Sequence, residues 1–253
     1  MIPLKEPWEL AVMRTAGRKL AEVVERLREQ VAVDMPTMDI DRITEEAILA
    51  LGARPAFKGY KVRKAVFPAS ICISINEQVV HGIPSRRRFK AGDLVKLDFG
   101  LVYGGYFADT AFSMVLPPMP AESVRLVQAT EASLYRGIEQ ARAGQRVGDI
   151  SYAIESFVKP QKLGVVTDMV GHGIGRKLHE PPSVPNVGKR GTGDLLKVGM
   201  VLAIEPMITL GTGKTKILND EWTCVTTDNS RSAHFEHTVA ITPTGPEILT
   251  RLD

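Results

Sequence analysis

Two stretches of the sequence that lie 107 residues apart share one pattern. Residues 90–98 (KAGDLVKLD) align with residues 197–205 (KVGMVLAIE), so that lysine, glycine, an apolar run and a final carboxylate coincide. Further upstream, Asp-Ile pairs at 39–40 and 149–150 each open a predicted helix that ends near a Leu-Gly pair. Chance similarity between turns that precede strands would explain either match, but both together predict an internal duplication.

The length of the chain fits one domain made of two such halves. At 253 residues and 44% hydrophobic content, the chain can bury a sizeable core. The repeat divides it into halves of roughly residues 1–118 and 119–253, each bringing one strand-end carboxylate to a shared seam. Internal symmetry places corresponding residues together at the interface between halves, where binding sites tend to lie.

The spacing of apolar residues predicts helices in pairs, each pair followed by a group of strands. Helical spacing predicts helices over 7–31, 39–51, 121–142 and 148–160. Runs of β-branched and apolar residues predict strands over 71–76, 94–103, 111–115, 165–169, 200–204, 206–210, 222–227 and 236–242.

The bulk composition argues against several classes of protein. A formal net charge of +3 is too small to indicate nucleic-acid binding. The chain starts without an apolar run long enough for a signal peptide, and no stretch approaches the ~20 apolar residues of a membrane span. Cys72 and Cys224 lack CxxC spacing, so two buried thiols in a reducing cytoplasm are expected, with a single disulfide as the alternative.

Four carboxylates stand within or at the ends of strongly apolar strands. Asp98 ends one such strand, and Asp109 follows a Gly-Gly pair at 104–105 that predicts a hairpin turn. The second strand of this hairpin would bring Asp109 back beside Asp98. Glu205 follows the apolar run at the end of the second repeat, and Glu236 precedes another apolar strand.

Burying these four carboxylates together without cations would be very costly. Two divalent ions would neutralise them, with four positive charges against four negative ones. The alternative is that each carboxylate pairs with a buried arginine or lysine. The four strands offer few such residues, and Lys96 is the obvious candidate.

All five histidines fall in three short segments near these carboxylates: His81, His172 with His179, and His234 with His237. A lone histidine is more often a structural residue than a ligand, but this concentration favours a functional role. His172 lies among glycines at 171, 173 and 175, which permit close approach of the backbone.

Four carboxylates and one imidazole form a hard, oxygen-rich set of ligands, unlike a structural zinc site built on thiolates. Such a set suits Mn, Fe(II), Co or weakly held Zn. Because carboxylates also bridge, two ions about 3.5–4 Å apart could share a water whose pKa falls toward roughly 7. This chemistry is typical of a hydrolase.

Six motifs, in order and spacing, closely resemble those of type I methionine aminopeptidases. They are CISINE at 72–77, VHGIP at 80–84, Asp98 with Asp-Thr at 109–110, GHGIGRKLHE at 171–180, IEPM at 204–207 and FEHT at 235–238. The resemblance covers nearly the whole chain. It implies the α+β pita-bread fold, in which an antiparallel sheet core is flanked by helix pairs in two pseudo-symmetric halves. It also implies removal of the initiator methionine by attack of a metal-bridging water on the first peptide bond.

The resemblance further implies a role for individual residues. Asp98, Asp109 and Glu236 would bind both of two divalent ions (Co, Mn, Fe(II) or Zn), and His172 and Glu205 would complete one of them. His179 would assist the scissile carbonyl, His81 would contact the substrate near the scissile amide, and Glu205 would shuttle protons. The positions that match the methionine pocket, each of which could otherwise be a core residue, are Phe57, Tyr60, Phe67, Leu178 and Trp222.

The family also implies partners and a location. The substrates would be peptides with N-terminal methionine and nascent polypeptides, met at the ribosome by a cytoplasmic monomer without a membrane segment. Two departures stand out. Residues 61–66 make one loop about four residues longer than usual, and His234 stands where the family commonly has glutamine, beside Ser232 in a stretch associated with a monovalent-cation site.

Three relatives of the same fold are alternatives. Proline-directed peptidases (aminopeptidase P or prolidase) usually carry an extra N-terminal domain, for which the first 40 residues leave no room. Non-catalytic binding modules typically lose metal ligands, whereas all five are present here. Type II methionine aminopeptidases carry a long insertion in the second half that is not found in this sequence.

Overall fold

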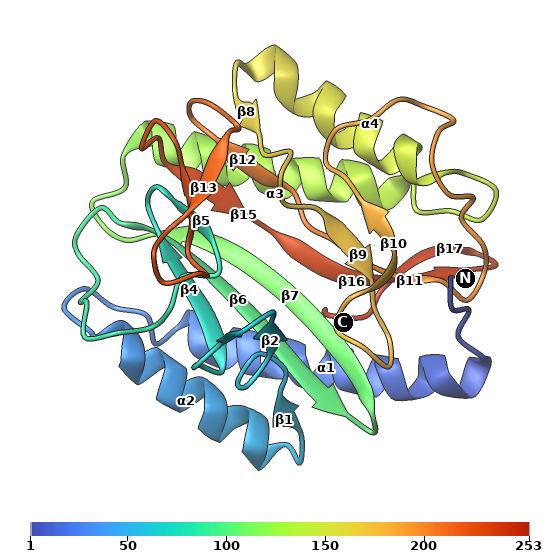
Figure 1. The fold of residues 1–253 in the computed structure, drawn as a ribbon, viewed down its shortest axis with the longest axis horizontal. Coiled ribbons are helices and arrows are strands. Elements are labelled where there is room, and N and C mark those ends of the chain that lie inside the picture. The colour runs from blue at the N-terminus through green and yellow to red at the C-terminus, as the bar shows by residue number, and fades with distance from the viewer. Residues whose placement is uncertain (1, 253) are drawn as a thin grey trace.

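The computed structural model describes residues 2–252. The central element of this part of the chain is a twisted antiparallel sheet of nine strands (Figure 1). The main path of this sheet runs β1-β6-β7-β16-β11-β9-β10, while β4 pairs with β6 and β17 pairs with β16. The strands are β1 (Arg54–Pro55), β4 (Ile71–Ile75), β6 (Leu94–Tyr103), β7 (Tyr106–Val115), β9 (Gly171–Gly173), β10 (Glu180–Val184), β11 (Val201–Ile204), β16 (Glu236–Thr242) and β17 (Gly245–Ile248).

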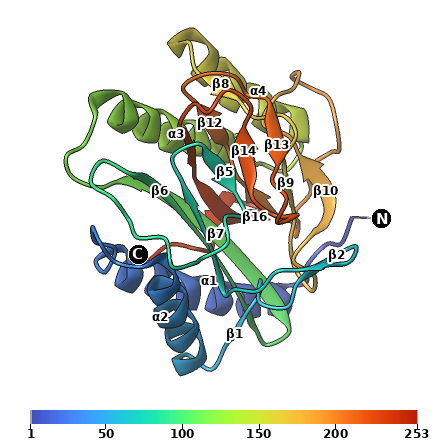
Figure 2. The same ribbon diagram turned by 60° about the vertical axis from the view of Figure 1, so that its left-hand side comes forward.

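Three smaller antiparallel sheets lie beside the large one within residues 2–252. The first has the order β15-β12-β8, the second β13-β14-β5, and the third is the hairpin β2-β3. Their strands are β2 (Lys61–Val62), β3 (Ala65–Val66), β5 (Gln78–Val80), β8 (Gly164–Val165), β12 (Met207–Thr209), β13 (Thr215–Ile217), β14 (Cys224–Thr226) and β15 (Ser232–His234). The longer loop seen in the sequence is therefore an ordered hairpin, which projects from the body of the molecule in Figure 2.

The helices occur in the two predicted pairs. They are α1 (Pro7–Arg28), α2 (Thr37–Ala50), α3 (Ala121–Glu139) and α4 (Val147–Val158), with a 3-10 turn η1 (Lys159–Gln161) after α4. In Figure 1, α1 and α2 lie toward the bottom and α3 and α4 toward the top, and side chains of all four helices belong to one apolar cluster with β6. Three of the predicted helices extend two or three residues too far at their C-terminal ends, because the last residues form turns.

Local sequence explains where α1 begins. Pro7 at the first helical position has the backbone angle that a helix needs and no amide hydrogen to lose. The backbone amide of Glu6 donates to Glu9 Oε2 at 2.9 Å, which completes a capping box. The face that α1 turns inward then packs on β6 and β7, with Leu20 and Leu27 fully buried.

The predicted hairpin at the glycine pair is confirmed and joins β6 to β7. Gly104 and Gly105 have φ values of 59° and 82°, as a two-residue turn between twisted strands requires. Register places Asp98 opposite Ala111 and Gly100 opposite Asp109. The second strand is longer than expected, since β7 starts at residue 106 and not at residue 111.

The main core fills the space between the helices and one face of the large sheet. Leu97, Phe99 and Leu101 of β6 are fully buried there and belong to one apolar cluster with side chains of α1 and α2. Cys72 and Cys224 are free thiols, and both are buried. Among residues 2–252, no helix is long and apolar enough to cross a membrane.

Gly17 of α1 tests how closely this helix packs on the end of the chain. A Cβ atom added at Gly17 would lie 2.2 Å from the backbone oxygen of Leu249. We expect Gly17→Ala to lower the free energy of unfolding by about 1–3 kcal/mol through overpacking, despite the better helix propensity of alanine. Urea denaturation would measure this, with Arg18→Ala at the exposed neighbour as the control. A more stable Gly17→Ala protein would show that the contact is loose.

Candidate metal centre and active site

The predicted metal ligands project from one face of the large sheet. Asp98 on β6 pairs with Ala111 on β7, and Ala111 pairs with Glu236 on β16, so the three side chains form one row across three strands. Directly paired residues point to the same face, and so do residues two apart along a strand. Asp109 therefore shares this face, while Phe99 and the other alternate residues point into the core.

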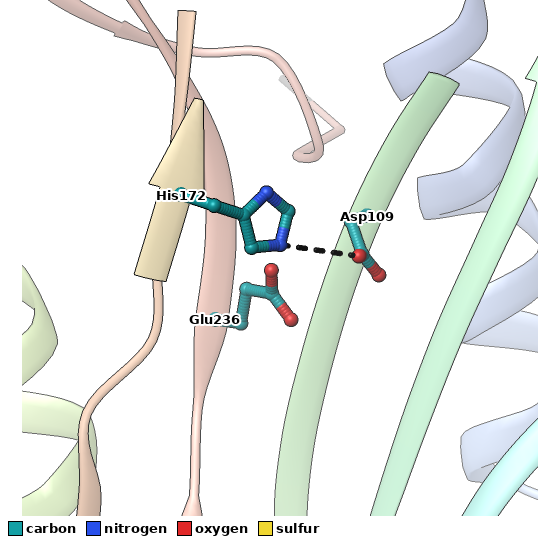
Figure 3. A group of neighbouring side chains, drawn as sticks. All are labelled: Asp109, His172 and Glu236. Carbon is teal, nitrogen blue, oxygen red and sulfur yellow. Dashed lines mark ion pairs between the residues drawn. The ribbon is translucent and has the colours of Figure 1, made fainter. Parts of the chain in front are cut away.

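The second half of the chain completes the cluster from the neighbouring strands. His172 on β9 pairs with Ala203 on β11, and Glu205 follows the end of β11. His172 Nε2 lies 4.0 Å from Asp109 Oδ2 and 3.6 Å from Glu205 Oε1. One ligand atom from each of Asp109, His172 and Glu236 lies within 4.8 Å of the others. Figure 3 shows these three side chains pointing toward one another.

The ring of His172 has the orientation of a metal ligand. Its Nδ1 lies 2.9 Å from the backbone oxygen of Gly173, which can only accept a hydrogen bond. Nδ1 therefore carries the proton, and Nε2 presents its lone pair to Asp109 and Glu205. Ligating histidines usually donate their second ring N–H to a carbonyl or carboxylate in this way.

His234 joins the cluster, although we did not predict it as part of the metal centre. Its Nε2 lies 3.6 Å from Glu205 Oε2 and 3.9 Å from Glu236 Oε2, and these three residues form a second group of neighbouring ligand atoms. The signal that could have revealed it is its spacing. His234 stands two residues before Glu236, which is the spacing of residues on one face of an extended chain.

Burial makes ionisation of the four carboxyl groups unfavourable. Loss of hydration raises the pKa of Asp98 to about 7 and that of Glu205 to about 8. Burial, and then repulsion from the neighbouring carboxylates, raises the pKa of Asp109 and of Glu236 well above the usual range. These groups need either protons or cations.

The residues present fit divalent cations. Within the described part of the chain, Asp98 Oδ1, Asp109 Oδ1 and Glu236 Oε1 are buried without a hydrogen-bond partner. Lys96, the alternative counter-charge, instead donates from Nζ to the backbone oxygen of Asn76 at 2.8 Å, and among residues 2–252 it forms no ion pair with the cluster. Hard oxygen donors with one imidazole are a set that binds divalent metals.

A pocket of about 100 Å³ opens directly onto this cluster. Every side chain for which the sequence predicted a role lines it: Phe57, Tyr60, Phe67, His81, Asp98, Asp109, His172, Leu178, His179, Glu205, Trp222 and Glu236. Two lining residues were not predicted, Cys72 of β4 and Val62 of the β2-β3 hairpin. The longer loop thus contributes directly to the wall of the pocket.

The apolar wall is held together by edge-to-face aromatic contacts. The rings of Phe57 and Phe67 have centroids 6.4 Å apart, and those of Phe67 and Trp222 are 5.2 Å apart. Phe57 and Phe67 are buried, whereas Val62 is 48% exposed. The pocket therefore runs from an enclosed apolar part to a mouth at the hairpin.

Two further histidines face the same space. His179 Nδ1 lies 2.6 Å from the hydroxyl of Tyr60, and the His179 ring packs against that of His172 with centroids 4.2 Å apart. Burial lowers the pKa of His179 and takes that of His81 to about 4, so both imidazoles are neutral near pH 7. His81 has a left-handed backbone with φ of 59°, a conformation that turns it into the pocket and is uncommon outside glycine.

The segment that carries His179 is fixed by a buried ion pair. Lys5 Nζ lies 2.6 Å from Glu180 Oε2, with both side chains almost fully buried. The other oxygen of Glu180 accepts the backbone amide of Lys177 at 3.1 Å. The N-terminal segment before α1 therefore helps to position the residue next to His179.

Comparison with known proteins agrees with this geometry. The sequence model of metallopeptidase family M24 matches residues 11–243. A methionine aminopeptidase of Clostridium perfringens is 47% identical over 250 residues, covering 99% of each chain. The crystal structure of a methionine aminopeptidase from Thermotoga maritima superposes with a TM-score of 0.96 at 40% identity, covering 100% of each chain. The chain therefore belongs to metallopeptidase family M24, among its methionine aminopeptidases.

A more distant structure shares the fold alone. A prolidase from Pyrococcus furiosus has a TM-score of 0.77 at 22% identity, and the match covers 99% of this chain but 66% of that one. The predicted α+β pita-bread architecture, with its antiparallel sheet and flanking helix pairs, is confirmed by these structural relatives.

The raised pKa values predict how the chelated protein responds to pH. Above about pH 7.5 the buried histidines are neutral in both the folded and the unfolded chain, because their pKa is near 6.5 when unfolded and burial only lowers it. Folded Asp98 and Glu205 still hold protons up to about pH 7 and 8, whereas the unfolded chain has lost them. Asp109 and Glu236 also hold protons there, so stability of the metal-free protein should fall as pH rises from 7.5 to 8.5.

Thermal melts in EDTA across this pH range would measure the effect, with protein reloaded with Mn(II) as the control. The reloaded protein should show a weaker dependence, because the cations replace the protons. A melting temperature of the chelated protein that stays level or rises over this range would contradict the assignment of buried, mutually repelling carboxylates.

Proposed function

We propose that this protein removes the N-terminal methionine from peptides and nascent proteins. One observation carries the proposal: a small apolar pocket ends at a buried cluster of four carboxylates and His172, in a chain 47% identical to a methionine aminopeptidase. A pocket of about 100 Å³ has room for one side chain at its enclosed end. A pocket of this size suits the single terminal residue of a protein substrate.

Two divalent ions would neutralise the four carboxylates. As the resemblance implies, Asp98, Asp109 and Glu236 would contact both ions, while His172 and Glu205 would complete one of them. When bound, such ions act as Lewis acids and lower the pKa of a shared water toward about 7. The donor set suits Mn, Fe(II), Co or Zn, and selection among these depends on ligand hardness and on availability.

Protein groups around the pocket would handle the protons and the developing charge. Glu205 lies at the edge of the cluster and can take a proton from the attacking water and pass it to the leaving amine. The Tyr60 hydroxyl can donate to His179 Nδ1, which leaves the proton of the neutral ring on Nε2. His179 Nε2 would then donate to the scissile carbonyl, and His81 would contact the substrate near the scissile amide.

The apolar wall would select the first residue of the substrate. Phe57, Phe67, Leu178 and Trp222, with Tyr60 at the edge, surround the enclosed part and suit an unbranched, flexible thioether side chain. The second residue would have to be small, because the chain leaves through a narrow mouth beside Val62.

The organisation of the chain supports the same proposal. We infer one catalytic domain whose halves, roughly residues 1–118 and 119–253, meet where β7 pairs with β16. One chain supplies every residue to which a role is assigned, so we propose that the protein acts as a monomer. The lack of a membrane-crossing helix in residues 2–252 is compatible with a cytoplasmic enzyme that meets nascent chains at the ribosome.

Peptide hydrolysis with defined metals tests the proposed function. Met-Ala-Ser should be cleaved after addition of Mn, Co or Fe(II) to chelated protein, whereas Leu-Ala-Ser and Ala-Pro-Ser should be cleaved poorly. Metal removal should abolish the activity and lower the melting temperature, since binding stabilises the folded state. A preference for Ala-Pro-Ser would assign the chain to the proline-directed peptidases instead. Full activity after verified removal of metal would exclude a metallopeptidase mechanism.

Replacing two histidines separates metal binding from transition-state stabilisation. His179→Ala should bind metal normally and lose about 100- to 1,000-fold in kcat with a smaller change in KM, because one donor to a developing oxyanion is typically worth this much. His172→Ala should lose metal affinity first. Elemental analysis beside steady-state kinetics distinguishes the two. Loss of an ion from His179→Ala, or near-normal turnover, would exclude the role proposed for His179.

A further inference from the structure

His234 is a buried histidine with no use in the proposed mechanism. Its side chain is 1% exposed, and neither ring nitrogen has a hydrogen-bond partner among residues 2–252. Buried polar groups are normally paired, so two unpaired nitrogens on one ring require an explanation. Two carboxylate oxygens lie close to Nε2, Glu205 Oε2 at 3.6 Å and Glu236 Oε2 at 3.9 Å.

The backbone, and not the side chain, fixes the position of this ring. The amide of His234 donates to Ser113 Oγ at 2.8 Å, and the same hydroxyl donates to His234 O at 2.7 Å. On its other side His234 pairs with Met207 in the β12-β15 ladder. Two neighbouring strands therefore hold the ring against the carboxylates.

Comparison with His172 distinguishes two roles for a buried imidazole, binding a metal ion and donating a hydrogen bond to a metal ligand. Nδ1 of His172 is directed at the backbone oxygen of Gly173, which frees Nε2 to bind a metal ion. Nδ1 of His234 has no acceptor of this kind in the described chain, so its ring lacks the support that orients a ligating histidine. A neutral ring in this place can satisfy Nε2 by donating its proton to a carboxylate.

We propose that His234 is a positioning residue of the metal centre, which donates from Nε2 to Glu205 and lies against Glu236. The separation of 3.6 Å is longer than a hydrogen bond, and a small rotation of the Glu205 side chain closes it. This bond would hold one carboxylate oxygen, leave the other for the metal ion, and fix the orientation of a ligand that also moves protons. The inference rests on the metal centre of the proposed function.

The test compares Co(II) binding by chelated wild-type protein with binding by two variants. His234→Gln keeps a neutral donor of similar reach, and His234→Leu keeps the bulk without a donor. We expect His234→Leu to bind Co(II) about 10- to 100-fold more weakly, which is the usual loss when a residue that orients a ligand is removed. His234→Gln should retain most of the affinity.

The visible absorption spectrum of the Co(II)-loaded protein distinguishes positioning from direct ligation. The spectrum of His234→Gln should match that of the wild type, since the ligand set is unchanged, whereas His172→Ala should alter it. His237→Gln is the control. His237 neighbours Glu236 but faces the opposite side of the sheet, where its Nδ1 lies 2.9 Å from Thr250 Oγ1, so Co(II) affinity should be preserved.

Each outcome decides one question. Wild-type protein that binds no Co(II) would overturn the metal centre itself. Wild-type affinity in His234→Leu would overturn the role of His234 alone. A changed Co(II) spectrum in His234→Gln would overturn positioning in favour of direct ligation. If His234→Leu does not fold, as circular dichroism would show, His234→Asn replaces it, because its shorter amide cannot reach Glu205 and the same weakening is expected.

Discussion

Repulsion among four carboxylates buried on one sheet face is the constraint on which this structure depends. Alternation along β6, β7 and β16 puts every second side chain on that face, so the strands that carry Asp98, Asp109 and Glu236 also carry the apolar side chains of the core. The strands cannot shift on the acidic face without disturbing the packing on the core face. The core packing therefore also keeps the carboxylates of the site in place.

Hydrogen bonds across the β7-β16 seam reinforce this arrangement. Thr238 Oγ1 accepts the backbone amide of Asp109 at 3.0 Å and donates to its carbonyl at 2.7 Å. Thr110 Oγ1 donates to the backbone oxygen of Glu236 at 2.7 Å. Each strand thus fixes the ligand-bearing backbone of the other. Two carboxylates distant in sequence are held at a defined separation before any ion arrives, which favours binding by preorganisation.

Features of the fold and the site could be predicted from the sequence where they depend on residues that are neighbours in the chain. Helical periodicity located all four helices, and Gly104-Gly105 located the hairpin, because both depend on neighbouring residues. The carboxylates stood out because charge is rare in apolar strands. The role of Val62 depends on where a hairpin lies in space, and that of His234 depends on a switch of sheets between β15 and β16. The position of Val62 leaves no pattern in the sequence, and the two-residue spacing of His234 from Glu236 indicates a shared face without showing which carboxylates the ring reaches.

The magnitudes explain why a site of this kind needs a large domain around it. A pKa raised from 3.8 to about 7 at Asp98 corresponds to roughly 4 kcal/mol against the charged form, to order of magnitude. Glu205, raised from 4.5 to about 8, carries a similar penalty. Either penalty is a large fraction of the 5–15 kcal/mol by which a typical domain is stable. The cluster can persist only where an extensive core offsets the cost, and a bound cation relieves the same repulsion. The free-energy penalty for ionising these carboxyl groups and their affinity for cations both come from burial and mutual repulsion. The buried acidic face therefore lowers the stability of the metal-free protein and also favours metal binding.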